Sequence, residues 1–420
     1  MPKRSADKAN LNFVPKDALK EARALRSNAK CFDDLEKVKR MLNQVISVSE
    51  EGSDEWVDAG IFLATLLLQE EKQDQRTTEI AKLLNERGFS YRLSKDALTQ
   101  NHKSMDVIDK SNTSESQVLS KPSEKFACAW DDSLPEYLIS KLNQAFHPTS
   151  TFWSSHNYSD GSGGNDPSPY FSYIVPLKDA ADDKHLKEAQ STTVLDQIIR
   201  DIQKRVAAHF PDVMGCAAAE WWAHCRPHSS GHQLHFDSDD EGRGGVRNPV
   251  CSTVTNLSTH TFGGETLVTT QSSKGTSLAT NGWLCSNRHN RLLTFRGDLL
   301  HGVVPGPGIG PGNIDVKRTT FMVAFWKRIR IQDDPGPGAA RPFSRVKEES
   351  WATPLMEKIE NVTHNCHEWT KCKPAVNCFF EVPVWEDVDL QRNEDDGLSL
   401  RQVKKYKLLP PYDEFFQFYS

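Results

Sequence analysis

The chain has 420 residues, with 51 Lys and Arg against 57 Asp and Glu, so its formal net charge at pH 7 is −6. Ten Trp and twenty Phe indicate a substantial hydrophobic core. The slightly acidic balance argues against nucleic acid as a partner, because a sequence-independent grip on nucleic acid is built from clustered Lys and Arg. No stretch approaches the roughly 18 consecutive apolar residues of a membrane span, so we expect no membrane partner either.

The N-terminal stretch is basic but lacks the apolar segment of a signal peptide, so the expected location is cytoplasmic. The nine cysteines are an odd number and lie far apart in the sequence. This pattern favours reduced thiols over a disulfide framework.

Residues 15 to about 90 show apolar residues at helical spacing, and the last of these predicted helices covers 75–87, before Gly88. They carry no catalytic signature, so we interpret residues 1–100 as a helical N-terminal extension. Residues 101–125 are polar and rich in Ser and Lys, which predicts a linker.

A folded domain is expected at residues 126–333, followed by a C-terminal extension at 334–420 that packs on it. Helices are predicted near 134–146 and 194–210. Between them, residues 152–170 are rich in Gly, Ser, Asn and Pro, so we expect irregular structure with the composition of a mobile lid.

Short apolar runs separated by turns dominate residues 216–331. Many such runs without intervening helices predict a sandwich or a barrel. The predicted strands are 170–177, 218–226, 232–238, 251–258, 263–271, 291–298, 301–305 and 318–326.

His235 and Asp237 are two positions apart in a predicted strand, where alternate side chains share one face, and Gln233 lies on the same face. A second histidine, His301, is expected at the end of another strand, 64 positions after Asp237. Two histidines and one carboxylate form the facial triad that holds Fe(II) and leaves positions open for substrate and O₂.

Arg318 opens the predicted strand 318–326, 17 residues after His301. A buried guanidinium at this place would bind a distal carboxylate in a bidentate manner. Thr320 lies on the same face of that strand and would add a hydroxyl donor.

Taken in order, the phrases HQLHFDS, GGETLV, RLLTF…LLHGV and RTTFMVAFW resemble the Fe(II)/2-oxoglutarate-dependent dioxygenases, in particular their prolyl-hydroxylase-like branch. The resemblance covers residues 126–331. It implies a double-stranded β-helix (jelly-roll) core. Together with the predicted flanking helices and the N-terminal helical extension, this makes α+β the expected fold class. One departure is the spacing from His301 to Arg318, which is longer than usual in the family because of the Pro/Gly-rich stretch 305–312.

By position, the resemblance implies that His235, Asp237 and His301 are the catalytic, iron-binding residues. It implies that Arg318 and Thr320 bind the co-substrate 2-oxoglutarate, with O₂ as oxidant and ascorbate as a reductant. Family members that transfer halide have a small residue in place of the carboxylate. With Asp237 present, the expected reaction is hydroxylation, desaturation or oxidative cyclisation of an unactivated C–H bond, with release of succinate and CO₂.

For the substrate we expect a small polar metabolite such as an amino-acid derivative, as in kainoid-synthase-like cyclases. The strand 218–226 leads directly into the metal strand and puts an Arg and a His beside aromatic side chains, which suits a carboxylate or amide with an apolar part. The predicted substrate-binding residues are Trp153, His156, Trp222, His224, Arg226 and Gln233.

Several alternatives stay open. The enzyme class also contains peptidyl and prolyl hydroxylases that act on protein side chains, and a non-catalytic jelly-roll binding module is the alternative outside that class. Nucleic-acid demethylases of this family carry a second arginine at the position where this chain has Ala324, which argues against a nucleic-acid demethylase. The oligomeric state is left open. A small zinc site is the alternative for the cysteine- and histidine-rich segment that contains His364, Cys366, His367, Cys372 and Cys378.

Overall fold

The computed structural model of this chain is a mixed α+β fold, and the strands among its described residues form three sheets. The structure describes residues 13–70, 89–103, 122–123, 125–158, 171–177, 193–239, 247–259, 263–275, 278–306, 317–331, 338–343, 348–359, 372–387 and 416–418. Within these ranges, no helix has the length and apolar character needed to cross a membrane. The eight cysteines of the described part are free thiols.

The largest sheet has eight strands in the order β12-β3-β4-β11-β6-β9-β2-β13, all antiparallel except the parallel pair β12 and β3. At its centre, the ten residues of β4 pair with the ten of β11, from Pro227 opposite Lys317 to Ala218 opposite Trp326. The strands are β2 (Ala127–Asp131), β3 (Phe171–Pro176), β4 (Ala218–Pro227), β6 (Cys251–Asn256), β9 (Leu292–Arg296), β11 (Lys317–Trp326), β12 (Gly338–Pro342) and β13 (Lys373–Pro374).

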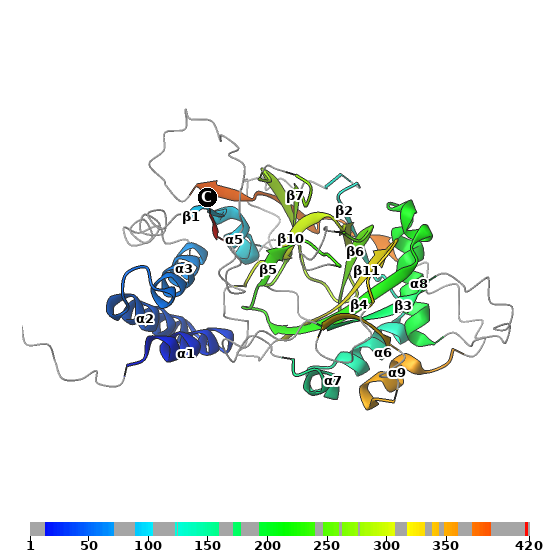
Figure 1. The fold of residues 1–420 in the computed structure, drawn as a ribbon, viewed down its shortest axis with the longest axis horizontal. Coiled ribbons are helices and arrows are strands. Elements are labelled where there is room, and N and C mark those ends of the chain that lie inside the picture. Colours follow the sequence, from blue (N-terminus) through cyan, green and yellow to red (C-terminus); the bar gives the residue numbers. More distant parts are fainter. Residues whose placement is uncertain are drawn as a thin grey trace, which may run out of the picture.

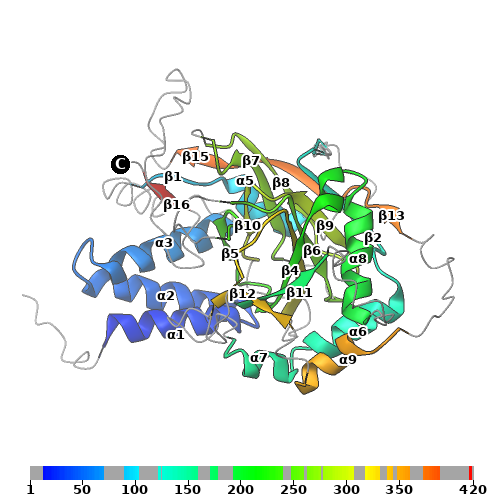
Figure 2. The same ribbon diagram turned by 45° about the vertical axis from the view of Figure 1, so that its right-hand side comes forward.

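A second, antiparallel sheet has five strands in the order β14-β8-β7-β10-β5. A third sheet pairs β1 with β15 and β16, so that strands far apart in the sequence lie side by side (Figures 1 and 2). These strands are β1 (Phe89–Leu93), β5 (His232–His235), β7 (Thr266–Ser272), β8 (Asn281–Cys285), β10 (Leu299–Val303), β14 (Phe379–Pro383), β15 (Trp385–Asp387) and β16 (Phe416–Phe418).

Helices α6 (Glu136–Phe146) and α8 (Val194–Val206) cover the eight-stranded sheet (Figure 2). The apolar residues of α8 recur at helical spacing, and Thr193 and Asp196 form a capping box at its start. The short helices α7 (Thr151–Ser155) and α9 (Thr353–Met356), the single 3₁₀ turns η1 (Pro211–Gly215) and η4 (Ser350–Ala352), and both long helices contribute to one cluster of buried side chains with β4 and β11, which we call the large core.

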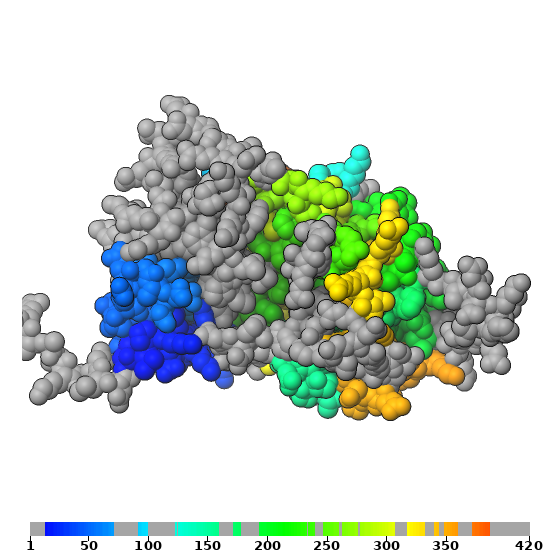
Figure 3. All heavy atoms as spheres, in the orientation of Figure 1, coloured from blue at the N-terminus to red at the C-terminus, as the bar shows by residue number. Residues whose placement is uncertain are grey.

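The N-terminal helices cover the other sheet. Helices α1 (Pro15–Ser27), α2 (Phe32–Val48), α3 (Asp54–Gln69) and α5 (Lys95–Lys103) share a buried cluster with one face of the five-stranded sheet. Helices α1, α2 and α3 form the blue end of the molecule in Figure 3. The opposite face of that sheet packs against β2 and β9 of the eight-stranded sheet. The described layers are therefore helices, five-stranded sheet, eight-stranded sheet and helices.

Most predicted strands and helices lie close to the observed ones, and residues 152–155 are the clearest difference. They were expected to be irregular but form α7, because Ser150 caps the helix and Phe152 and Trp153 are buried. Residues 159–170, the predicted helix 75–87 and most of the predicted linker lie outside the described residues. The boundaries of the predicted domains stay a prediction.

Candidate metal centre

His301 and His235 are brought together by strand pairing. His301 lies in the middle of β10, where it is the register partner of His235 in β5 on one side and of Val268 in β7 on the other. The ring centroids of the two histidines are 4.4 Å apart. His301 was expected at a strand end. Its place between two ladders instead fixes its backbone from both sides.

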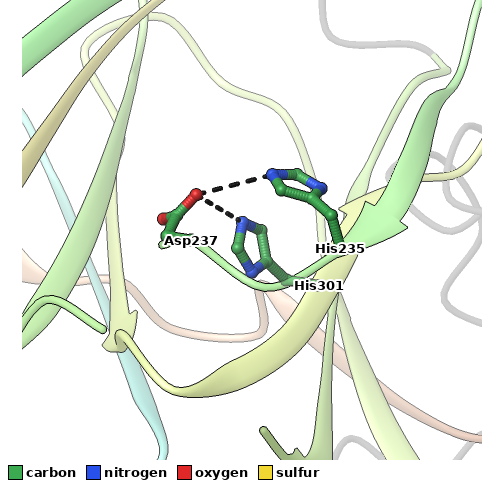
Figure 4. A group of neighbouring side chains, drawn as sticks. All are labelled: His235, Asp237 and His301. Atoms are coloured by element: carbon green, nitrogen blue, oxygen red, sulfur yellow. Dashed lines mark ion pairs between the residues drawn. The ribbon is translucent and has the colours of Figure 1, made fainter. Parts of the chain in front are cut away.

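Asp237 joins the two histidines from beyond the end of β5, which stops at His235. One carboxylate oxygen, Oδ1, lies 3.5 Å from Nε2 of His235 and 3.7 Å from Nε2 of His301. Figure 4 shows the carboxylate facing both imidazole rings. Ligand atoms of all three residues lie within 4.8 Å of one another, close enough to hold one metal ion.

Asp237 is held by the opposite sheet. Its Oδ2 accepts a hydrogen bond of 2.5 Å from Ser252 in β6, and its backbone carbonyl accepts one of 2.7 Å from the side chain of Asn248. The strand alternation predicted for His235 and Asp237 is therefore not what orients the carboxylate. The cluster instead bridges the two sheets, because its histidines come from one and its carboxylate is fixed by the other.

The electrostatics of the cluster suit a divalent cation. Burial raises the pKa of Asp237, but the imidazoles of His301 and His235 and the Ser252 hydroxyl lower it by more, so it lies well below the ordinary value. Burial lowers the pKa of His301 to about 4, against the opposing charge of Asp237. An ionised carboxylate and a neutral imidazole are the protonation states that bind a metal ion.

The ring orientation of His301 is also fixed. Its Nδ1 lies 2.9 Å from the Leu299 carbonyl oxygen, so Nδ1 donates its proton there and Nε2 keeps its lone pair toward Asp237. Two imidazoles and one carboxylate, with side-chain exposures of 26% for His235, 10% for Asp237 and 8% for His301, fit the 2-His-1-carboxylate donor set of Fe(II).

A polar patch extends from this cluster across the eight-stranded sheet. Arg318 is the register partner of Arg226, and Thr320 is the register partner of His224. Because side chains alternate along both strands, the four lie on one face. Arg318 and Thr320 were predicted to bind 2-oxoglutarate, and His224 and Arg226 were predicted to bind the primary substrate. The register places these two pairs side by side. Arg318 and Thr320 are each 7% exposed.

The patch is continuous with the cluster through His232. The ring of His232 lies 4.9 Å from that of His235 and 5.1 Å from that of His224. Burial and the charge of Arg226 lower the pKa values of both His232 and His224 well below the ordinary value. These histidines are therefore neutral at physiological pH, and the positive charge of the patch resides on Arg226 and Arg318.

Tyr158 closes the patch at the edge of β4. Its hydroxyl lies 3.2 Å from Nδ1 of His224 and accepts hydrogen bonds from Nε of Arg226, at 3.3 Å, and from the backbone N–H of Cys225, at 3.2 Å. Tyr158 was expected only as part of an irregular segment. Its role depends on a tertiary contact across more than 60 residues, for which the sequence holds no signal.

Arg318 carries the strongest indication of an anion site. Among the described residues, its guanidinium donates one hydrogen bond, from Nη1 to the Gly264 carbonyl, which leaves other N–H groups for a ligand. Glu265 lies in the same region, with no hydrogen-bond partner for its carboxylate oxygens among the described residues. Burial raises the pKa of Glu265 to about 7, so it offsets the charge of Arg318 only in part near neutral pH.

The remaining predicted substrate residues have other surroundings. Trp222 is buried in the large core opposite Met322. Trp153 also lies in the large core, and its Nε1 donates to the His147 carbonyl. His156 lies 2.6 Å from the hydroxyl of Tyr173.

Aromatic packing of α7 against the large core holds Trp153 and His156 in place, and their role in substrate binding stays a prediction. The structure does not describe the side chain of Gln233. Of the predicted zinc residues, 364–367 are outside the described part. Cys372 accepts a hydrogen bond from Arg205, and Cys378 lies between the two sheets.

Comparison with protein-family models gives no match, and comparison with curated proteins gives none either. Among solved structures, the chain is similar to a prolyl-4-hydroxylase from Pseudomonas putida (14% identity, TM-score 0.28, covering 49% of this chain and 94% of that one). It is also similar to HygX from Streptomyces hygroscopicus with nickel and 2-oxoglutarate bound (12% identity, TM-score 0.29, covering 52% of this chain and 92% of that one).

A third similar structure is an oxidoreductase of the 2OG-Fe(II) oxygenase family from Burkholderia pseudomallei (15% identity, TM-score 0.22, covering 35% of this chain and 61% of that one). The TM-scores of these three structures are all below 0.5. The oxidoreductase from Burkholderia pseudomallei belongs to the 2OG-Fe(II) oxygenase family, the family whose motifs this sequence resembles.

Proposed function

We propose that the protein is an Fe(II)- and 2-oxoglutarate-dependent oxygenase with a double-stranded β-helix core. The observation that carries the proposal is the meeting of His235, Asp237 and His301, whose ligand atoms lie within 4.8 Å of one another. These residues would hold Fe(II), which supplies O₂ activation coupled to the decarboxylation of 2-oxoglutarate to succinate and CO₂.

The protein's own side chains bind and orient the co-substrate. Arg318 would bind the distal carboxylate of 2-oxoglutarate, with Thr320 donating a hydroxyl hydrogen bond from the same face. Burial of both residues supports this role, because a charge-assisted hydrogen bond is stronger where water is excluded. Asp237 stays ionised, so it remains available as a ligand.

For the primary substrate we propose a small polar metabolite such as an amino-acid derivative, oxidised at an unactivated C–H bond. Support comes from the neutral imidazoles of His224 and His232 and the guanidinium of Arg226, which lie between the metal cluster and Tyr158. This combination of a cation and neutral donors suits a carboxylate or amide group.

The test is a substrate screen that follows succinate release above the uncoupled background. The screen includes amino-acid derivatives and proline-containing peptides, and active compounds are repeated with Arg226→Gln and His224→Ala. The proposal predicts turnover of a small metabolite and a raised KM for that metabolite in both variants. Turnover of peptides alone would make the protein a peptidyl hydroxylase and overturn the substrate proposal. Absence of succinate formation with every compound would contradict the oxygenase assignment.

A further inference from the structure

A buried hydrogen-bonded network connects the C-terminal ends of α1 and α3 to the loop that follows β10. Arg26, in the last turn of α1, donates from Nη2 to Oε1 of Gln69, at 2.8 Å, and to the carbonyl of Gly306, at 3.4 Å. Gln69, the last residue of α3, donates from Nε2 to the carbonyl of Pro305, at 2.7 Å. Arg26 and Gln69 are 2% and 3% exposed.

The arrangement of Arg26 is supported from a further side, because its guanidinium lies over the ring of Phe62, 5.4 Å from the centroid. Both ends of the Gln69 amide are used in hydrogen bonds. Its Oε1 accepts one from Arg26, and its Nε2 donates one to the Pro305 carbonyl in the loop. A buried network of this kind is stable only when each member keeps its partner. The loop at 305–306 is therefore fixed by the N-terminal helices.

The same loop meets two others at a junction formed by backbone atoms and the ring of His228. The backbone N–H of Gly306 donates to the carbonyl of His228, at 3.0 Å. A Cβ added at Gly306 would lie 2.8 Å from that oxygen and 3.0 Å from Cα of Gly263. Gly263 and Gly264 have φ angles of +69° and +72°, which favour glycine. Three loops thus approach one another to backbone contact.

This junction ends at Arg318. The carbonyl of Gly264 accepts the hydrogen bond from Nη1 of Arg318, and a Cβ added at Gly264 would lie only 1.9 Å from Nη1. The position of the guanidinium is therefore set by the backbone at Gly264. The Gly264 backbone lies near the His228 carbonyl, the adjacent Gly263 packs against His228 and Gly306, and Gly306 is held by Arg26.

We propose that Arg26 and Gln69 are positioning residues of the 2-oxoglutarate site, acting through the loop at 305–306 and the glycine junction on the guanidinium of Arg318. The inference rests on the proposed function. It makes α1 and α3 a part of the oxygenase site, where residues 1–100 were expected to be an extension without a catalytic role. Packed elements and hydrogen-bond networks of this kind carry coupling between distant positions.

The test measures 2-oxoglutarate binding directly. We would titrate 2-oxoglutarate into the Mn(II)-loaded full-length protein by calorimetry, and measure Mn(II) affinity and Tm for each variant. Gln69→Leu keeps the approximate size of the side chain and loses both hydrogen bonds. Gln69→Glu keeps an acceptor for Arg26 but places a carboxylate against the Pro305 carbonyl. Asp58→Asn is the matched control, because it breaks the other bridge between α1 and α3, the 3.2 Å ion pair with Arg23.

Both Gln69 variants are expected to weaken 2-oxoglutarate binding on the order of tenfold, with Mn(II) affinity within about twofold of wild type. Asp58→Asn is expected to lower Tm and to leave 2-oxoglutarate affinity unchanged. Wild-type 2-oxoglutarate affinity in both Gln69 variants would overturn the inference, and so would a parallel loss of Mn(II) affinity, Tm and 2-oxoglutarate affinity. Arg318→Ala distinguishes failure of this inference from failure of the proposed function. If Arg318→Ala loses 2-oxoglutarate binding while the Gln69 variants bind it as wild type does, the inference fails and the proposed function stands. Absence of binding to the wild-type protein would overturn both.

Discussion

Arg226 and Arg318 stand directly opposite each other in the antiparallel ladder of β4 and β11. Burial, and after it the neighbouring charge of Arg226, lowers the pKa of Arg318 to about 10, so Arg318 stays charged at neutral pH. Two like charges on opposing positions repel, and low dielectric strengthens the repulsion. An anionic ligand relieves it, which is a physical reason to expect a carboxylate at this place.

Replacing Arg318 should therefore weaken co-substrate binding strongly. Loss of a charge-assisted pair in a buried site costs on the order of 2–5 kcal/mol, or roughly thirty-fold or more in Kd. Arg318→Lys should also be impaired, because an ammonium cannot reproduce the bidentate fork. Calorimetric titration of 2-oxoglutarate into Arg318→Ala and Arg318→Lys checks this. Unchanged Kd values would place the co-substrate elsewhere.

Gly264→Ala should damage the same site without replacing a charged residue. The residue has φ +72°, and its new Cβ would collide with the guanidinium of Arg318. We expect roughly tenfold weaker 2-oxoglutarate binding or more, together with a lower Tm. The control is Gly215→Ala, where no heavy atom lies within 4 Å of the added Cβ. Equal affinities in the two variants would show that Arg318 is free to move aside.

Ser252→Ala should weaken metal binding although Ser252 is not a proposed ligand. It removes the hydrogen bond that holds Oδ2 of Asp237, and loss of such a partner lowers metal affinity roughly tenfold or more. Thr253→Val is the matched control, because it deletes the neighbouring buried hydrogen bond, to the carbonyl of Val323. A competition titration with Mn(II) measures both. Wild-type affinity in Ser252→Ala would show that Asp237 is oriented without Ser252.

Stability should fall in mild acid because of His156. Burial lowers the pKa of His156 to about 4, with the Phe152 carbonyl opposing the shift. The unfolded chain takes up a proton at His156 near pH 6.5, and the folded chain takes it up only near pH 4. The contribution of His156 to the free energy of unfolding is therefore fully present above about pH 6.5. It is lost as the pH drops from about 6.5 to about 4, by at most about 3 kcal/mol.

Urea unfolding at pH 7 and pH 5 measures this loss. His156→Gln should show a smaller difference between the two pH values than wild type, and His147→Gln, at an exposed position, should resemble wild type. An identical pH dependence in His156→Gln would assign the loss of stability to another group.

The sequence predicts the strands well where apolar runs end at turns. The run at 318–326 and the run at 218–226 match β11 and β4 almost residue for residue. Which strands pair could not be predicted from the sequence, because pairing depends on contacts between residues far apart in the chain. That Arg226 lies directly opposite Arg318 follows from a register that no local pattern encodes.

For the candidate site, the motif around His235 predicted two of the three clustered residues, and the strand before the Gly-Pro turn gave His301. The hydroxyl of Ser252 and the carboxyl of Glu265 could not be predicted, since their importance arises from burial beside Asp237 and Arg318. The prediction of irregular structure for residues 152–155 was wrong for a related reason. Burial of their aromatic side chains overrides a composition that favours irregular structure.

The most direct test of the iron assignment is the stoichiometry of Fe(II) binding under anaerobic conditions. Wild-type protein should bind one Fe(II) per chain, and Asp237→Ala and His301→Ala should lose this binding while keeping their far-ultraviolet circular dichroism. His289→Ala, which alters a histidine bonded to the Leu257 carbonyl, should bind Fe(II) as wild type does. Undiminished Fe(II) binding by Asp237→Ala would contradict the account.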